Sequence, residues 1–272
     1  MLLLNGDCLE LMKTLPDKSI DLFICDLPYG CLSSGYRATG IHPQSNNPNQ
    51  NPKKTEFKTQ GCSWDIKIDL DAFWVQVERL MKNDHTPIIH FCNTRFGYDL
   101  IKSKEKWFRY DLVWDKRAGV GFLNANKQPL RSHENIYIFA KKGASYYRKD
   151  IEVEGAKEWK QFGKVDSTGV YDLVRENPVV RPVGTITSKA GIRCPKSVIE
   201  MNNRKEKGQH PTAKPVDLYK FLIERYSKEG DTVLDPTFGS GNSGRACEEL
   251  KREYIGIEKD EKFFNAYQKT ET

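Results

Sequence analysis

A carboxylate, a stiffened turn and an aromatic ring follow one another near the N-terminus, in the run Asp26-Leu27-Pro28-Tyr29. The run comes directly after the apolar segment Ile20 to Cys25, which reads as a buried strand, and open α/β sheets bind ligands where their strands end. The carboxylate of Asp26 and the backbone carbonyl of Leu27 can accept N–H groups and stabilise positive charge on a nitrogen atom. Tyr29 offers a flat face for stacking on a nucleobase. These residue types suit chemistry on an amine, although an isolated tetrapeptide of this kind more often marks an ordinary junction between strand and turn.

A second group of functional residue types lies near the C-terminus. The glycine-rich turn Phe238-Gly239-Ser240-Gly241 follows the predicted strand Asp231 to Asp235 and, with Gly244, completes a G-x-G-x-x-G pattern. Such glycines let the backbone approach a ligand, and Glu258 ends the next predicted strand, near the offset at which a carboxylate binds ribose hydroxyls. The pattern predicts a ribose-bearing cofactor and excludes a Walker phosphate loop, because no Gly-Lys-Ser/Thr follows.

The chemical type of the cofactor depends on Asp235, which precedes Pro236 at the end of that strand. The glycines alone also fit a nicotinamide or flavin enzyme. An acidic side chain at this position repels a pyrophosphate and attracts a cationic group. S-adenosyl-L-methionine carries an ammonium and a sulfonium and no phosphate, so Asp235 favours this cofactor.

Together the two motifs resemble those of the DNA amino-methyltransferases, whose hallmarks are Asp-Pro-Pro-Tyr and Phe-x-Gly-x-Gly. Their order along this chain is similar to that of the β group of the family. Leu27 stands where the family most often has proline, which affects the rigidity of the turn but leaves the main-chain carbonyl in place. The similarity covers the greater part of the chain and continues through Asn5-Gly6-Asp7-Cys8, Trp114-Asp115-Lys116, Arg131-Ser132-His133-Glu134-Asn135 and His210-Pro211-Thr212-Ala213-Lys214-Pro215.

The resemblance implies a role for each matching position. Asp26, Leu27, Pro28 and Tyr29 would form the catalytic turn. The cofactor would lie against the turn that contains Phe238, Gly239, Ser240 and Gly241, with Asp235 near its methionine amine, Glu258 at its ribose, Asp7 near its adenine and Lys214 closing over the methionine end.

Three positions also fit a role outside catalysis and binding. Asp7 equally suits a helix N-cap ahead of Leu9 to Leu15, and Lys214 suits a surface lysine before a proline that starts a helix. His133 suits a structural hydrogen bond, whereas as DNA-binding residues Lys116, Arg131 and His133 would meet phosphates or base edges. His133 and Glu134 are adjacent on a predicted strand, so they point to opposite faces and do not form an acid–base pair.

Asp at the first motif position resembles the adenine-N6 enzymes, since the cytosine-N4 enzymes more often begin with Ser. The expected activity is therefore methylation of adenine N6 in a base flipped out of double-stranded DNA. Alternatives are cytosine N4, RNA or a protein glutamine as substrate, a DNA-binding relative without activity, and a nicotinamide enzyme. Methylation at cytosine C5 needs a Pro-Cys step, and Cys194-Pro195 has the reverse order.

The elements that must position these residues alternate between strand and helix, which predicts an α/β fold with a doubly wound, mostly parallel sheet of the Rossmann-like methyltransferase type. The predicted strands are 2–4, 20–25, 86–92, 110–114, 135–140, 231–235 and 253–258, and the predicted helices are 9–15, 69–81, 215–226, 243–251 and 261–267. Residues 1–143 and 208–272 would form the catalytic domain, with 31–62 as a mobile loop that is either a lid or a plain insertion. The charged, irregular segment 144–207 would recognise the target.

Composition sets the remaining limits. The 272 residues are 38% hydrophobic and 29% charged, without an apolar run long enough to span a membrane, which favours a cytoplasmic protein. The net charge of +6 includes basic clusters at 102–106, 141–149 and 189–207 that suit a polyanion, although such runs are usually solvated faces. Seven scattered cysteines predict reduced thiols and no metal site. A homodimer and a cognate restriction endonuclease are partners that the sequence leaves open.

Overall fold

The computed structural model describes residues 1–30, 37–40, 55–58, 65–155, 157, 159–161, 186–188, 191–203 and 213–268. The chain divides into two compact units, one made of Met1–Tyr147 and Ser197–Thr272 and the other of Arg148–Lys196. The larger unit contains the sheet and the helices that position the candidate site.

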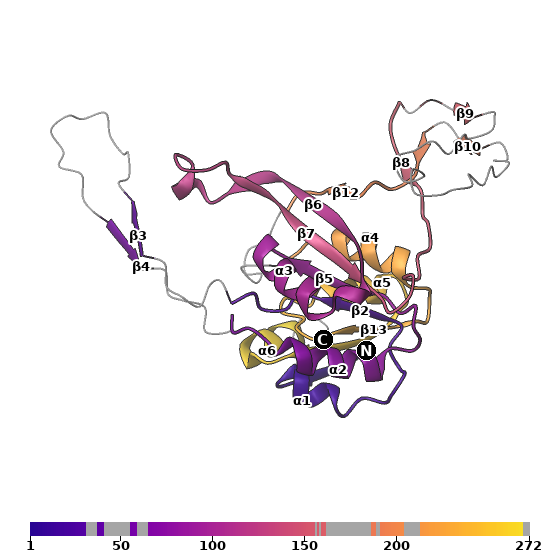
Figure 1. The fold of residues 1–272 in the computed structure, drawn as a ribbon, viewed down its shortest axis with the longest axis horizontal. Helices are drawn as coiled ribbons and strands as arrows, with labels where there is room; N and C mark the ends of the chain where they lie inside the picture. Colours follow the sequence, from indigo (N-terminus) through magenta and orange to yellow (C-terminus); the bar gives the residue numbers. More distant parts are fainter. Residues whose placement is uncertain are drawn as a thin grey trace, which may run out of the picture. The chain divides into compact units, whose positions relative to one another are not determined.

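Eight strands form the sheet of the larger unit (Figure 1). In spatial order they are β1 (Leu2–Asn5), β14 (Glu253–Glu258), β13 (Thr232–Asp235), β2 (Leu22–Cys25), β5 (Ile88–Cys92), β7 (Arg131–Phe139), β6 (Phe108–Val120) and β12 (Val198–Glu200). Strand β7 pairs antiparallel with β5 and β6, and the other pairings of this sheet are parallel. The predicted mostly parallel α/β sheet is confirmed.

Helices cover both faces of the sheet, because the strands in its centre are apolar on both sides. In β2, Phe23 and Cys25 pack into one core with α1 (Cys8–Met12), α2 (Leu70–Leu80) and α3 (Thr94–Ser103). Leu22 and Ile24 pack into a second core with α4 (Val216–Tyr226), α5 (Asn242–Glu249) and α6 (Glu261–Gln268). Burying each such aliphatic or aromatic side chain contributes about 1.5–3 kcal/mol, so both cores hold the sheet in place. The predicted doubly wound arrangement is confirmed.

Side-chain caps determine where three of these helices begin. Asp7 accepts a hydrogen bond from the Leu9 N–H at 3.0 Å at the start of α1. Asp69 caps α2 through the N–H groups of Asp71 and Ala72, and Asn93 caps α3. Helix α5 instead follows Gly241 in a left-handed conformation. Because a short polar side chain satisfies an N–H group that the first turn leaves unpaired, Asp and Asn are favoured at these positions.

The structure differs from the sequence-based expectations at one end of β6, at one end of β7, and in the segment that contains β12. The ladder between β6 and β7 continues to the pair Val120 and Arg131, beyond the predicted ends at 114 and 135. A ladder is held by backbone hydrogen bonds, so polar side chains do not end it. Strand β12 belongs to the edge of the sheet, where the Trp114 Nε1–H donates to the Met201 carbonyl at 2.8 Å. The segment outside the α/β unit is therefore narrower than 144–207, and its role in target recognition stays a prediction.

Smaller elements complete the described chain. They are the 3₁₀ helices η1 (Glu105–Trp107) and η2 (Phe122–Asn124) and the antiparallel pairs β3 (Arg37–Gly40) with β4 (Thr55–Lys58), β8 (Ile151–Glu152) with β11 (Ile192–Arg193), and β9 (Trp159–Gln161) with β10 (Ile186–Ser188). The rest of the predicted loop 31–62 lies outside the described residues. No helix in the described part of the chain is long and apolar enough to cross a membrane.

Candidate active site

The two motifs meet because β2 and β13 are neighbouring parallel strands that end at the same edge of the sheet. The Thr237 hydroxyl, after β13, donates a hydrogen bond of 3.1 Å to the main-chain carbonyl of Asp26, after β2. Strands β1 and β14 end at this edge too, and the Gly6 N–H donates to the Glu258 carbonyl at 3.0 Å. Antiparallel β7 begins there and contributes Glu134. Residues far apart in the sequence therefore surround one space.

That space is a cavity of about 510 Å³, a size typical of small-molecule and cofactor sites. Ten of the predicted site residues line it, namely Asp7, Asp26, Leu27, Pro28, Tyr29, Lys214, Phe238, Gly239, Ser240 and Glu258. The predicted cofactor contacts Asp235 and Gly241 do not line the cavity, and neither do the predicted DNA contacts Lys116, Arg131 and His133.

Glu258 and Asp7 lie at the end of the cavity formed by β1 and β14. Glu258 accepts hydrogen bonds from the Gly239 N–H at 2.9 Å and from the Asp260 N–H at 2.8 Å, and burial raises its pKa. Burial also acts to raise the pKa of Asp7, but hydrogen bonds from Lys259 and the Leu9 N–H outweigh it and lower that pKa. Asp7 is thus a helix cap that also lines the cavity.

Gly241 serves packing and does not form part of the cavity wall. Its φ of 74° lies in the left-handed region, and a Cβ atom there would clash with the ring of Tyr267 on α6. By contrast, a Cβ atom on Gly239, with φ of 53°, would be clear of other side chains. The missing side chain of Gly241 makes room for α6, and its expected contact with the cofactor stays a prediction.

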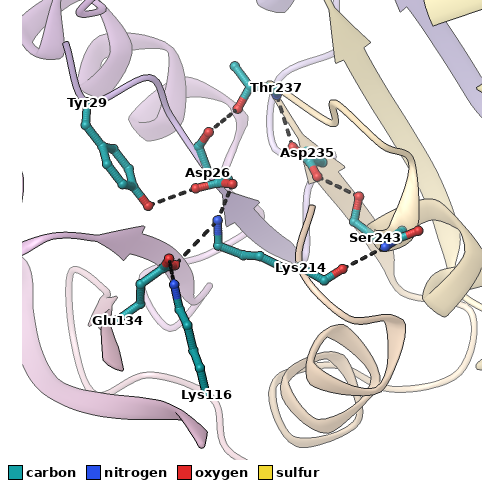
Figure 2. Close-up of polar contacts among 9 residues, drawn as sticks. Asp26, Tyr29, Lys116, Glu134, Lys214, Asp235, Thr237 and Ser243 are labelled. Carbon is teal, nitrogen blue, oxygen red and sulfur yellow. Dashed lines mark hydrogen bonds and ion pairs between the residues drawn. The ribbon is translucent and has the colours of Figure 1, made fainter. Parts of the chain in front are cut away.

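Asp235 lies behind the cavity wall, where its side chain is 1% exposed. Its two carboxylate oxygens accept hydrogen bonds from the Ser243 hydroxyl at 2.6 Å and the Thr237 N–H at 3.0 Å (Figure 2). Burial raises the pKa of Asp235 to about 7. Asp235 therefore holds the glycine turn to α5, and its expected contact with a methionine amine is not supported.

The turn Asp26-Leu27-Pro28-Tyr29, whose catalytic role is a prediction, brings both oxygens of the Asp26 carboxylate into hydrogen bonds (Figure 2). One oxygen accepts from the Tyr29 hydroxyl at 2.9 Å, and the other accepts from the Lys214 ammonium. The Tyr29 ring stacks on Phe96 with centroids 5.2 Å apart. Leu27 is 1% exposed, so the side chain that replaces the family's proline is part of the core.

A chain of alternating charges extends from Asp26 across the base of the cavity. Lys214 lies between Asp26 and Glu134, and Glu134 also pairs with Lys116 (Figure 2). The sequence indicated that His133 and Glu134 face opposite sides, and indeed His133 is exposed while Glu134 lines the cavity. No role was predicted for Glu134. The alternation of side chains along β7 was the signal in the sequence that could have pointed to it.

The predicted DNA-binding residues lie on the β6–β7 hairpin, which leads away from Glu134. Lys116 forms an ion pair with Glu134, and the Arg131 Nε–H donates to the His133 carbonyl at 3.1 Å. Beyond them, Val120 and Phe122 are 51% and 76% exposed. The DNA contacts of these residues stay predictions, and Lys116 would have to leave Glu134 to make one.

The described residues contain no group of three or more His, Cys, Asp or Glu side chains placed to hold a metal ion. Four of the five described cysteines, Cys8, Cys25, Cys92 and Cys247, are buried free thiols, and burial raises the pKa of each, whereas Cys194 is exposed. A thiol with a raised pKa is a poor nucleophile at neutral pH.

The fold of this chain is similar to that of solved methyltransferase structures. M1.HpyAVI in complex with S-adenosylmethionine is 19% identical with a TM-score of 0.57, covering 99% of this chain and 98% of that chain. The cytosine-N4-specific PvuII DNA methyltransferase is 14% identical with a TM-score of 0.60, covering 98% and 84%. These likenesses confirm the Rossmann-like methyltransferase fold.

The sequence comparisons identify the family. A family model for DNA methylases of the N6/N4 type matches residues 20–269, so the chain belongs to this family. The type II methyltransferase M.HinfI of Haemophilus influenzae is 26% identical over 288 residues, covering 98% of this chain and 67% of that protein. M.BglII of Bacillus subtilis is 25% identical over 273 residues, covering 97% and 67%. The expected kinship with the DNA amino-methyltransferases is confirmed.

Proposed function

We propose that this protein transfers a methyl group from S-adenosyl-L-methionine to the N6 amine of adenine in double-stranded DNA. The observation that carries the proposal is the position of Asp26. Its carboxylate lines the same cavity as the glycine turn Phe238-Gly239-Ser240 and Glu258. A cofactor held by that turn and a base amine held by Asp26 would therefore meet within one enclosed space.

The charges of the cavity fit a cationic cofactor better than a dinucleotide. Seven carboxylate side chains line it against three lysines, the acids being Asp7, Asp26, Asp65, Asp69, Glu134, Glu258 and Asp260 and the bases Lys67, Lys214 and Lys259. An excess of carboxylates attracts the ammonium and sulfonium of S-adenosyl-L-methionine and repels a pyrophosphate. Gly239, Ser240 and Glu258 would hold the cofactor, which supplies an electrophilic methyl group on sulfur.

The catalytic turn would make the base amine nucleophilic enough to attack that methyl group. The nitrogen lone pair forms the new N–C bond while the C–S bond breaks, and positive charge develops on nitrogen. Asp26 and the Leu27 carbonyl would accept the two N–H groups and stabilise that charge, and the Thr237 hydroxyl already orients the neighbouring Asp26 carbonyl. The nitrogen then passes a proton to the Asp26 carboxylate, which already accepts one of its N–H groups, and the cofactor leaves as the neutral thioether. Transfer is direct, so no cysteine nucleophile is needed.

The preference for adenine over cytosine rests on the first residue of the turn. A carboxylate is a stronger hydrogen-bond acceptor than the serine hydroxyl that more often begins this motif in cytosine-N4 enzymes. Cytosine N4 is the second candidate, because adenine and cytosine both present an exocyclic amine beside a ring nitrogen.

DNA would approach along the β6–β7 hairpin. A target base must leave the duplex to reach Asp26, and the exposed Phe122 offers a face that could stack where bases separate. Arg131 and His133, between this tip and Glu134, are the proposed contacts to phosphate or base edges. Target recognition by the segment 144–207, a homodimer, a cognate endonuclease and a cytoplasmic location stay predictions.

The test is product identification. The protein is incubated with unmethylated bacterial genomic DNA and labelled S-adenosylmethionine, the DNA is digested, and the nucleosides are separated by mass spectrometry. We expect N6-methyladenine, and none with Asp26→Ala. N4-methylcytosine would overturn the adenine assignment and keep the mechanism. A parallel incubation offers DNA, RNA and cellular protein together, and label in RNA or protein but not in DNA would refute the proposed substrate. Equal activity of Asp26→Ala would refute the proposed site.

A further inference from the structure

The starting observation is that an ammonium already lies on the Asp26 carboxylate, where the proposed function places the substrate amine. The carboxylate oxygens accept hydrogen bonds from Tyr29 and Lys214. A carboxylate oxygen can accept more than one hydrogen bond, but an ammonium left on Asp26 would repel the positive charge that develops on the base amine during transfer. Transfer as the proposed function describes it is therefore favoured when this donor moves. The polar atoms around Asp26 indicate where the ammonium goes.

Lys214 is a buried ammonium held between two carboxylates. Its side chain is 4% exposed, and its Nζ atom lies 3.6 Å from Glu134 Oε2 and 4.9 Å from the centroid of the Phe91 ring. Burial acts to lower the pKa of Lys214, but the charges of Asp26 and Glu134 outweigh burial and raise that pKa. Lys214 is therefore charged, and a buried charge without a partner is strongly disfavoured.

Glu134 is placed to receive this ammonium. Burial acts to raise its pKa, but Lys214 and Lys116 outweigh burial and lower that pKa, so the side chain is a carboxylate. Lys116 donates to Oε1, whereas Oε2, which lies nearer Lys214, has no hydrogen-bond partner among the described residues. A buried carboxylate oxygen without a donor is uncommon, and this one faces the Lys214 ammonium.

The backbone of Lys214 is fixed while its side chain is free to reach either acid. The Asn242 side-chain amide donates to the Lys214 carbonyl at 2.7 Å, which ties this residue to the start of α5. The move from Asp26 to Glu134 then needs only a rotation of the lysine side chain. Tyr29 is less free to move, because its ring stacks on Phe96.

We propose that Lys214 is a positioning residue that holds Asp26 while the base site is empty and passes its hydrogen bond to Glu134 when the target amine takes its place. This inference rests on the proposed function. It assigns Lys214 to the base-binding end of the cavity, in place of the expected contact with the methionine end of the cofactor. Glu134 keeps the ammonium paired, so binding of the amine does not leave a buried charge alone.

The kinetic experiment compares Glu134→Gln, Lys214→Met and the double variant with the wild type. Methyl transfer to genomic DNA gives kcat, and calorimetry gives the Kd for S-adenosylmethionine. We expect kcat to fall about 10- to 100-fold in each single variant, with the cofactor Kd within about twofold of wild type. The double variant should be no slower than Lys214→Met, because Glu134 acts only through the ammonium.

A matched control uses Lys220 and Glu249, an ion pair on α4 and α5 in which neither residue lines the cavity. Lys220→Met and Glu249→Gln should leave kcat unchanged. Two results would overturn the inference. One is a double variant whose loss is the product of the two single losses. The other is a Lys214→Met enzyme with an unchanged kcat and a weakened cofactor Kd, which would return Lys214 to the cofactor.

A melting experiment separates this inference from the proposed function, because it needs no turnover. Lys214→Met leaves Asp26 and Glu134 without their shared cation and should lower Tm by about 10 °C. Adding Glu134→Gln should restore part of that loss. If Lys214→Met melts like the wild type, or the second change lowers Tm further, the pairing is refuted even in an active enzyme. A wild type that shows this coupling in Tm but methylates no DNA would refute both the proposed function and the transfer of the ammonium on amine binding. The position of the ammonium between the two acids would stand.

Discussion

One buried carboxyl, Asp235, should contribute less to the stability of this protein as pH rises towards neutrality. Burial raises the pKa of Asp235 to about 7 in the folded protein, against 3.8 for a free carboxyl. The folded state thus holds this proton more tightly than the unfolded state. The stabilisation is fully present below pH 3.8 and is lost as pH rises through about 7.

The magnitude follows from the two pKa values. The difference corresponds to about 4 kcal/mol, of which roughly 3 kcal/mol is lost between about pH 5 and pH 8. Asp235→Asn removes the titration and keeps the shape. The amide oxygen can still accept the Thr237 N–H, and the Ser243 hydroxyl lies 2.8 Å from the Tyr254 hydroxyl, to which it can donate instead.

The assay is urea unfolding of both proteins at about pH 5 and about pH 8, with the free energy of unfolding extrapolated to water. The variant should gain stability relative to the wild type as pH rises, by about 3 kcal/mol between the two conditions. Groups other than Asp235 titrate alike in both proteins, so the difference isolates this one carboxyl. If the free energies of unfolding of the two proteins change in parallel with pH, the raised pKa of the buried Asp235 carboxyl is refuted.

Three further outcomes are expected. Gly241→Ala should lower the free energy of unfolding by about 1–3 kcal/mol, measured by urea unfolding, because the new methyl group meets Tyr267 and the φ of 74° disfavours it. An unchanged midpoint would show that α6 is not packed on this turn. Asp26→Ala should abolish turnover while calorimetry finds the cofactor Kd within a few-fold of wild type, and a lost cofactor would contradict a role confined to the base. Phe122→Ala should weaken DNA binding about tenfold in a fluorescence titration with Tm unchanged, since the ring is 76% exposed. Equal DNA affinity would remove this tip from the interface.

The sequence by itself determined the elements that have a strong local signal. The apolar run before Asp26 became β2, and the run before the glycine turn became β13, because continuous apolar segments suit strands covered on both faces. Asp7 was predicted either to cap a helix or to lie near the adenine of the cofactor. It caps α1 and lines the cavity, and its contact with a cofactor stays a prediction. Each of these outcomes depends on residues within a few positions of one another.

The tertiary structure decided which residues meet. Asp26 and Thr237 are neighbours because β2 and β13 pair in the sheet, and Glu134 joins them because β7 runs opposite to β5. Lys214 turned towards Asp26, and Asp235 turned behind the cavity wall. The order and direction of strands are set by long-range packing over the whole sheet, which no short window of sequence contains. A motif can therefore name the residue types of this site, but the partners of each charge follow from the sheet.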